Sequence, residues 1–489
     1  MKQKYLFIIG LVCIFNACIE DTGNYDYTSL QEVAINGLDD TYRFVLQKPY
    51  SITPDINTRI DEKNLAYCWR IGADTLCQTK ELNHTFTRIP SAASTNPLTF
   101  EVLDKTTDVR YSKRMPISIV SPFTTGWLML TSLSEGGAQL AFQSFEAEKM
   151  LYQDVYEEVN GEKLTGTPLW VKQLNYSDGA TGAKLDRVSI ICENGKCPEL
   201  DGTSLVRNKF YEDEFRSVTP HICNITSEYY TVDKALNIVS DGLIYGKAAK
   251  GTMDTPDDAY YQYPFEGDDK GYHIAPYIVA PTYSAFYFAL DELNHRFVVY
   301  KGNSLSSKVS SITWDDEKSV SGIDLDDVPG KMVWMGAITY DEKFYSIILN
   351  DGKYILRHMD VDWDGTTTLS GYAELPDGVI AENSSFALHP TSPYMFVSNG
   401  QTLKIINLET LSDKNVDIQN LCVYDGEILA MHYAYGQNPK VDQFGIAIQT
   451  GNNESALLIV NPELSAQGEI LERYEHVEGK IVSLCRKAM

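Results

Sequence analysis

The sequence predicts an all-β protein, with an immunoglobulin-like β-sandwich followed by a β-propeller of about seven blades. Short apolar runs alternate with polar residues between turn signals, and only residues 146–158 have a spacing that allows a short helix. Trp69 lies midway along an early run, as does the buried tryptophan of an immunoglobulin-like sandwich. Beyond residue 123, turn dipeptides recur about every 50 residues, which is the length of a four-stranded blade.

The composition excludes one class of partner. The chain has 489 residues, and its 41 Lys and Arg residues against 67 Asp and Glu residues give a formal net charge of −26. A phosphate-binding surface needs clustered cations, so this balance argues against nucleic acid as a partner. It also argues against binding to an anionic membrane by charge alone.

The N-terminus resembles a bacterial lipoprotein signal peptide over residues 1–17. Two lysines precede an apolar stretch that is too short to span a bilayer as a permanent helix, and Ala17 comes directly before Cys18. We therefore expect lipid attachment at Cys18, a lipidated linker over residues 18–29, and anchoring in the outer membrane. Glu20 and Asp21 resemble a surface-export signal, which predicts exposure at the cell surface. The alternative is a plain signal peptide followed by an incidental cysteine.

Two domains are expected after the linker. Residues 30–121 contain short strand-like runs and form the predicted sandwich. Residues 123–489 form the predicted propeller, and a ring of six or eight blades stays open. The turn dipeptides in this part are Asn160-Gly161, Asn194-Gly195, Asp241-Gly242, Asp351-Gly352 and Asn399-Gly400.

Two pairs of cysteines have spacings that suit hairpin disulfides. A two-residue turn at Asn194-Gly195 would place Cys192 opposite Cys197, and a turn at Gly72-Ala73 would place Cys68 opposite Cys77. The alternative is that all four are free thiols. The pairing of the remaining cysteines is left open by the sequence; they are Cys223, Cys422 and Cys485.

Three segments resemble the PKD-like family of lipoproteins. The opening Cys18-Ile19-Glu20-Asp21-Thr22-Gly23-Asn24-Tyr25-Asp26-Tyr27 is similar to the family's start, and Tyr67-Cys68-Trp69 resembles the Tyr-x-Trp of its sandwich. Gly126-Trp127-Leu128-Met129-Leu130 resembles the strand that opens the family's C-terminal part. The resemblance implies a surface protein associated with a SusC/SusD-type nutrient importer, which takes up oligosaccharides or peptides. It brings no catalytic residues with it.

Asp360, Asp362 and Asp364 are the best candidate metal ligands in the sequence. Alternate carboxylates followed by Gly365 can wrap a hard cation such as Ca²⁺. Gly371 stands where an EF-hand loop needs its twelfth-position glutamate, so a full EF-hand is excluded. The alternative is a solvated turn at the edge of a blade, and no other cofactor is expected.

A cluster of tyrosines is the best candidate for a ligand-binding surface. Tyr260, Tyr261, Tyr263 and Tyr272 lie close together in the sequence, among prolines and aspartates that include Asp268. Flat aromatic faces stack on sugar C–H surfaces, and carboxylates accept hydrogen bonds from hydroxyl or amine groups. The alternative is that these rings pack beneath a long loop between strands.

Together these features predict a non-catalytic surface protein that captures an oligosaccharide or peptide. The sequence contains no Gly-x-Ser-x-Gly, His-Glu-x-x-His, phosphate-binding glycine loop or dinucleotide fingerprint. Two alternatives remain: a propeller hydrolase or lyase that acts on polysaccharide through scattered carboxylates, and a structural subunit of the importer complex.

Overall fold

A computed structural model describes most of the chain after the first 31 residues. The described residues are 32–145, 149–177, 184–216, 218–227, 235–248, 261, 263–281, 286–301, 307–338, 342–412, 414–434 and 443–487. They form two compact units. The first contains the described residues up to Arg43, together with Pro49–His84 and Pro90–Ser118. The second contains Phe44–Lys48, Thr85–Ile89 and the chain from Ile119 onward.

The N-terminal strands form one four-stranded sheet and three two-stranded pairs. The large sheet has the order β6-β5-β8-β9, and the pairs are β1-β4, β10-β2 and β3-β7. These strands are β1 (Ala34–Asn36), β2 (Tyr42–Val45), β3 (Pro49–Ile52), β4 (Asp55–Asn57), β5 (Leu65–Ile71), β6 (Asp74–Cys77), β7 (Leu82–Thr85), β8 (Leu98–Asp104), β9 (Val109–Met115) and β10 (Ile117–Val120).

Trp69 in β5 is the central side chain of this part, as the sequence predicts. It is fully buried and its ring centroid lies 4.6 Å from that of Phe100 in β8. Its indole Nε1 donates a hydrogen bond to the Lys80 carbonyl at 3.1 Å, so the one polar atom of the ring is satisfied.

The predicted pairing of Cys68 with Cys77 is wrong by one residue. The turn at Gly72-Ala73 forms as expected, and Ile71 pairs with Asp74. A register shift then follows, so that Cys77 lies opposite Trp69 instead of Cys68. An inserted residue of this kind moves every later side chain to the other face of the strand. Both cysteines are free thiols in the structure.

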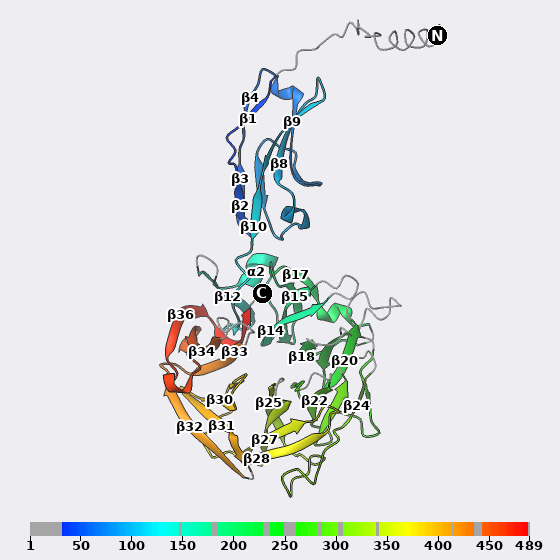
Figure 1. Cartoon of the computed structure of the whole chain (residues 1–489), viewed down its shortest axis with the longest axis vertical. Coiled ribbons are helices and arrows are strands. Elements are labelled where there is room, and N and C mark those ends of the chain that lie inside the picture. The colour runs from blue at the N-terminus through cyan, green and yellow to red at the C-terminus, as the bar shows by residue number, and fades with distance from the viewer. Residues whose placement is uncertain are drawn as a thin grey trace, which may run out of the picture. The chain divides into compact units, whose positions relative to one another are not determined.

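The second unit consists of successive small sheets, which are antiparallel except for the parallel pair of β21 and β24. In the described residues from 126 onward, six sheets have four strands and one has three. Figure 1 shows them arranged around a common centre, with the colour changing from cyan to red in chain order. The strand orders are β13-β12-β11-β37, β14-β15-β16-β17, β18-β19-β20, β21-β24-β23-β22, β25-β26-β27-β28, β29-β30-β31-β32 and β33-β34-β35-β36.

The strands of this unit are short and are joined mainly by hairpins. They are β11 (Gly126–Ser132), β12 (Ala138–Ser144), β13 (Leu151–Tyr152), β14 (Thr167–Ser177), β15 (Lys184–Glu193), β16 (Pro198–Asp201), β17 (Arg207–Phe210), β18 (Ile222–Ser227), β19 (Ala235–Ser240), β20 (Leu243–Ala248), β21 (Glu266–Gly267), β22 (Phe286–Asp291), β23 (Arg296–Lys301), β24 (Lys308–Ser311), β25 (Lys331–Ile338), β26 (Lys343–Asn350), β27 (Lys353–Val361), β28 (Thr367–Glu374), β29 (Phe386–Leu388), β30 (Tyr394–Asn399), β31 (Thr402–Ser412), β32 (Asn415–Val423), β33 (Ile428–Ala434), β34 (Gln443–Gly451), β35 (Glu454–Val460), β36 (Ile470–Glu478) and β37 (Lys480–Lys487).

The C-terminal strand closes the ring of sheets. β37 pairs antiparallel with β11, the first strand of the unit, so that Trp127 lies opposite Arg486. Separate hydrophobic clusters fill the spaces between successive sheets, and one of them packs Trp127 against Ala447 and Ile481. The last strand of the chain thus completes the first sheet of the unit, and the ring has no open end. The prediction of an all-β chain with a propeller-like second part is confirmed.

One short α-helix is present in the described residues. α2 (Val155–Asn160) lies within and just beyond the segment with predicted helical spacing. Asp154 caps it by accepting a hydrogen bond from the Glu157 backbone N–H, and Gly161 ends it with a φ of 70°. Single 3₁₀ turns occur at Glu62–Asn64, Ser91–Ser94, Tyr211–Glu214 and Leu464–Ala466.

The turn dipeptides give tight hairpins in some sheets and a shifted register in another. Asp241-Gly242 and Asp351-Gly352 each have two positive φ angles, as a two-residue type I′ turn requires. At Asn194-Gly195 the register differs, since Ser189 pairs with Glu199, one residue away from the predicted partner.

This shift corrects the predicted Cys192–Cys197 disulfide. Cys192 packs in the cluster that contains Val188 and Ile190, whereas Cys197 packs in the cluster that contains Ile191 and Tyr211. The two thiols therefore belong to the cores on opposite faces of one sheet, and both are free and buried.

Candidate functional site

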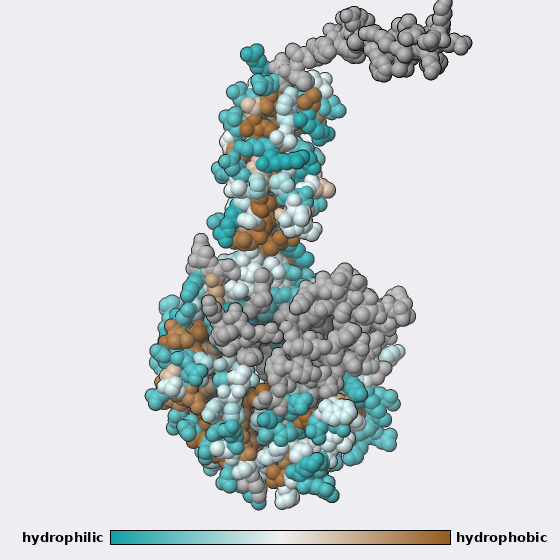
Figure 2. Space-filling model, in the orientation of Figure 1, coloured by the Kyte–Doolittle hydropathy of each residue, from teal (hydrophilic) through white to brown (hydrophobic). Residues whose placement is uncertain are grey.

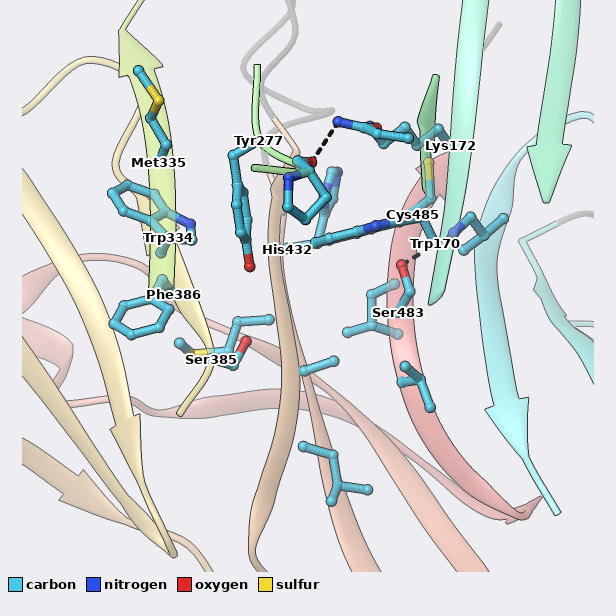
Figure 3. A pocket seen from close by; sticks show the side chains of 18 of the residues that line it. Trp170, Lys172, Tyr277, Trp334, Met335, Ser385, Phe386, His432, Ser483 and Cys485 are labelled. Atoms are coloured by element: carbon cyan, nitrogen blue, oxygen red, sulfur yellow. Dashed lines mark hydrogen bonds between the residues drawn. The ribbon is translucent and has the colours of Figure 1, made fainter. Parts of the chain in front are cut away.

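The innermost strands of the sheets enclose a cavity of about 580 Å³. Its lining comes from strands of six of the seven described sheets, β14, β18, β25, β29, β33 and β37, and from residues 276–278, which lie between β21 and β22 in the chain. A volume of this size is typical of sites that hold a small molecule. Figure 3 shows Lys172, Trp170 and Cys485 on one side of the cavity, and Trp334, Met335 and Phe386 on the other.

Lys172 in β14 is the cation of the cavity. Its Nζ donates hydrogen bonds to Asn224 Oδ1 and, at 3.2 Å, to the Ile225 carbonyl. It also lies 5.6 Å from the centroid of the Trp170 ring, within the range of a cation–π contact. Burial lowers the pKa of Lys172 to about 8, and no ion pair with a carboxylate involves it in the part of the chain that the structure describes.

Asn224 in β18 holds Lys172 in place. A register shift in the β18–β19 pairing lies directly at this residue. The side-chain amide is almost fully buried, donates a hydrogen bond to the Pro276 carbonyl at 2.8 Å, and accepts one from the Ile225 backbone N–H at 2.8 Å. The Asn224 side chain, whose oxygen accepts the hydrogen bond from Lys172, is therefore fixed by two further contacts.

Four aromatic side chains line the cavity. The rings of Trp170 and Tyr277 meet edge to face, with centroids 6.1 Å apart. Opposite them, Trp334 packs on Phe386 with a centroid distance of 5.7 Å. Gly336 makes room for Trp334, because a Cβ at residue 336 would lie 2.4 Å from the indole ring. All four rings are partly exposed, so each presents a face or an edge to the cavity.

Two further titratable side chains of the lining are neutral near pH 7. Burial lowers the pKa of His432 to about 4, and the imidazole meets the Trp127 ring edge to face at 5.8 Å. Burial raises the pKa of Cys485 to about 11, and its sulfur accepts a hydrogen bond from the Gln173 backbone N–H at 3.3 Å.

The cavity differs in charge from the rest of the protein. Its lining contains no Asp or Glu among the residues that the structure covers. Asp186 lies outside the lining and is paired, since its Oδ2 lies 3.0 Å from Nζ of the buried Lys487. Hydrophilic residues cover much of the described surface in Figure 2, as expected for a chain with a net charge of −26.

The structure buries two of the four predicted tyrosines and exposes a third. Tyr261 is fully buried and stacks on Phe215 with a centroid distance of 4.8 Å. Tyr272 is 7% exposed, and its hydroxyl donates a hydrogen bond to the Phe265 carbonyl. Tyr263 is 74% exposed and outside the cavity lining. Tyr260 lies outside the described residues, so the alternative of packed rings holds for Tyr261 and Tyr272.

The structure does not gather the three predicted metal ligands. Asp360 accepts hydrogen bonds from Ser370 Oγ and contacts His358 Nε2 at 3.2 Å, while Asp364 accepts one from the Thr366 backbone N–H. Asp362 belongs to the turn between β27 and β28, where its backbone pairs with Thr366. No group of three or more His, Cys, Asp or Glu side chains suited to a metal ion occurs in the described ranges. In this structure the three aspartates belong to a hydrogen-bonded turn, and Ca²⁺ binding there stays a prediction.

The cavity residues were missed because the sequence signal is weak and distributed. A lysine within the strand-like run Leu169-Trp170-Val171-Lys172 is the one local hint, since a charge in the innermost strand of a blade needs a polar space to face. The other lining residues come from segments up to about 300 positions away, which only the closed ring brings together.

Comparison with known families confirms the resemblance found in the sequence. A model of the PKD-like family matches residues 18–168. The chain contains a PKD-like region. This region spans the N-terminal strands and continues into the first sheet of the second unit. Comparison with curated proteins found no match.

Solved structures that are similar to this chain have low sequence identity to it. A quinonprotein alcohol dehydrogenase-like protein from Bacteroides thetaiotaomicron is 11% identical, with a TM-score of 0.47, over 94% of this chain and 100% of that one. The β-propeller domain of Cps50 from Myceliophteria thermophila is 11% identical, with a TM-score of 0.30, over 58% of this chain and 94% of that one. Both TM-scores are below 0.5, so the closed ring of sheets itself identifies the propeller-like unit.

Proposed function

We propose that this protein is a lipid-anchored surface protein whose seven-bladed propeller binds a small nutrient, an oligosaccharide or a peptide, in its central cavity. The cavity carries the proposal, because it combines aromatic walls with a few fixed polar groups, as ligand sites do. The seven sheets in the described chain are the proposed blades. A SusC/SusD-type importer is the proposed partner.

The lining supports binding in preference to hydrolysis. Glycoside hydrolases of the common kind use a pair of carboxylates on either side of the scissile bond. Among the described residues around the cavity there is no Asp or Glu that could form such a pair. The aromatic rings and the single ammonium group suit recognition of a ligand.

The anchor proposal rests on Cys18, which lies outside the described residues. No helix in the described chain is long and apolar enough to cross a membrane. Cys18→Ala should release the protein from the membrane fraction, and Cys13→Ala is the matched control that should leave fractionation unchanged. An unmodified Cys18 peptide in mass spectrometry would contradict the proposal.

The binding function is tested with a library of oligosaccharides and short peptides, read by calorimetry and coupled to product analysis. Trp334→Ala should weaken binding of any hit by about 5- to 150-fold, since a stacked aromatic anchor contributes on the order of 1–3 kcal/mol. Trp363→Ala is the control, because Trp363 is 79% exposed and does not line the cavity. Equal losses in both variants, or released products, would contradict a binding role for the cavity.

A further inference from the structure

The charge of the cavity is opposite in sign to that of the whole chain. The protein has a net charge of −26, yet the described lining offers one ammonium group and no carboxylate. A buried cation without a paired carboxylate is costly, and proteins keep such a group where it has a use. An anionic group of a ligand would supply the missing charge.

The ammonium group is oriented and has a free donor. A lysine carries three N–H donors, and those of Lys172 have two acceptors in the described residues, Asn224 Oδ1 and the Ile225 carbonyl. Because Asn224 is itself held by Pro276, Lys172 does not need to be reordered when a ligand arrives. The third donor is available for an anion.

The other polar groups of the cavity suit a sugar better than a peptide. The Tyr277 hydroxyl and the indole N–H groups of Trp170 and Trp334 have no hydrogen-bond partner within the described chain. Such groups can bind sugar hydroxyls, while the ring faces stack on sugar C–H surfaces. A free peptide would also bring an N-terminal ammonium group, for which the described lining offers no carboxylate.

We propose that the cavity recognises an acidic sugar, and that Lys172 binds its carboxylate while Trp170, Tyr277 and Trp334 contact the sugar ring. This inference rests on the proposed binding function and specifies its ligand class. The cavity volume of about 580 Å³ suits one to three sugar units.

The test compares disaccharides that contain glucuronate, galacturonate or mannuronate with their neutral counterparts, by calorimetry on the full chain. At least one acidic member should bind at least about tenfold more tightly than its neutral partner, the size of one charge-assisted hydrogen bond. Lys172→Met should abolish this preference, and Lys172→Arg should retain most of it. Lys331→Met, an exposed lysine of β25, is the matched control and should change nothing.

Three outcomes would overturn the inference. If acidic and neutral sugars bind equally, the binding function stands and the assignment of Lys172 to a carboxylate is wrong. If a tripeptide binds through its free C-terminus and no acidic sugar does, the ligand class is wrong. If no oligosaccharide or peptide binds, or if Trp334→Ala leaves the affinity of every ligand that binds unchanged, the proposed function fails as well.

Discussion

Replacing Arg296 should destabilise the blade that carries Tyr277 into the cavity. The Arg296 side chain is 1% exposed, and all five of its N–H donors are used. Nε donates to Asp291 Oδ2 at 3.1 Å, the two terminal nitrogens bind Asp268 at 2.6 and 2.8 Å, and further bonds reach Ser311 Oγ and the Gly271 carbonyl. The guanidinium holds the pKa of Asp268 below its usual range.

The expected magnitude follows from what Arg296→Met would leave behind. Asp291 is fully buried and would lose its only cationic partner among the described residues. Breaking a buried pair by removing one member typically costs about 3–5 kcal/mol. Arg473→Met is the matched control, since Arg473 pairs at the surface with Asp425, which is 64% exposed, and such pairs contribute at most about 1 kcal/mol.

The Arg296→Met substitution should also disturb the segment that leads to Tyr277 in the cavity. Asp291 Oδ1 accepts a hydrogen bond from the His273 backbone N–H at 3.0 Å, and the chain continues from there to Ala275, whose N–H binds the Leu290 carbonyl. Tyr277 follows two residues later. We therefore expect Arg296→Met to weaken ligand binding together with stability, whereas Arg473→Met should affect neither.

Chemical denaturation monitored by tryptophan fluorescence measures the free energy of unfolding of each variant. A loss in Arg296→Met no larger than that in Arg473→Met would refute the reasoning. It would mean that the Arg296 network is compensated by water or by local rearrangement instead of stabilising the blade.

Two further predictions concern the packing between sheets. Gly445→Ala should cost about 1–3 kcal/mol, because its Cβ would lie 2.5 Å from the buried Trp127 ring, while Gly451→Ala should stay within about 0.5 kcal/mol; equal denaturation midpoints would contradict this. Native Cys192 and Cys197 should resist alkylation, since burial raises the pKa of both thiols, to about 12 for Cys192, and the partly exposed Cys68 should react first. A Cys192–Cys197 disulfide peptide in non-reduced mass mapping would contradict the observed register.

The architecture could be predicted from the sequence because its signals are local. Alternating runs and dipeptides such as Asp241-Gly242 specify hairpins within a few residues, and Trp69 marks the sandwich core by its position in one strand. The register could not be predicted in the same way. A single inserted residue near Leu76 moves the Cys77 side chain to the other face of the strand, and no local sequence pattern indicates this insertion.

The site could not be predicted because it does not exist within any one segment. Lys172 and His432 meet in one cavity only after β37 has paired with β11. The tyrosine cluster was misleading for a related reason. Local aromatic density does not distinguish an exposed surface from a core. Tyr261 and Tyr272 each pack in a hydrophobic cluster with residues from other segments of the chain.

Lys172 is the group of the cavity that should titrate near neutral pH. Burial lowers its pKa to about 8. Burial raises the pKa of the thiols of Cys485 and Cys223 to about 11, so they stay neutral below that pH. Burial also lowers the pKa of His432 to about 4 and raises that of Tyr277, which leaves both neutral between about pH 5 and pH 9.

The preference for an acidic sugar should therefore fall as the pH rises. Below pH 8 the ammonium form of Lys172 is present before binding, so the affinity should be constant. Above pH 8 binding must first return a proton to Lys172, and the affinity should fall by up to about tenfold for each pH unit until the bound-state pKa is passed. Calorimetry at several pH values, repeated in buffers of different ionisation enthalpy, should show proton uptake that begins above about pH 7 and is absent in Lys172→Met. A neutral sugar is the control, because its binding does not require the charge. An acidic sugar whose affinity is flat from pH 6 to pH 10 would show that Lys172 does not hold its carboxylate.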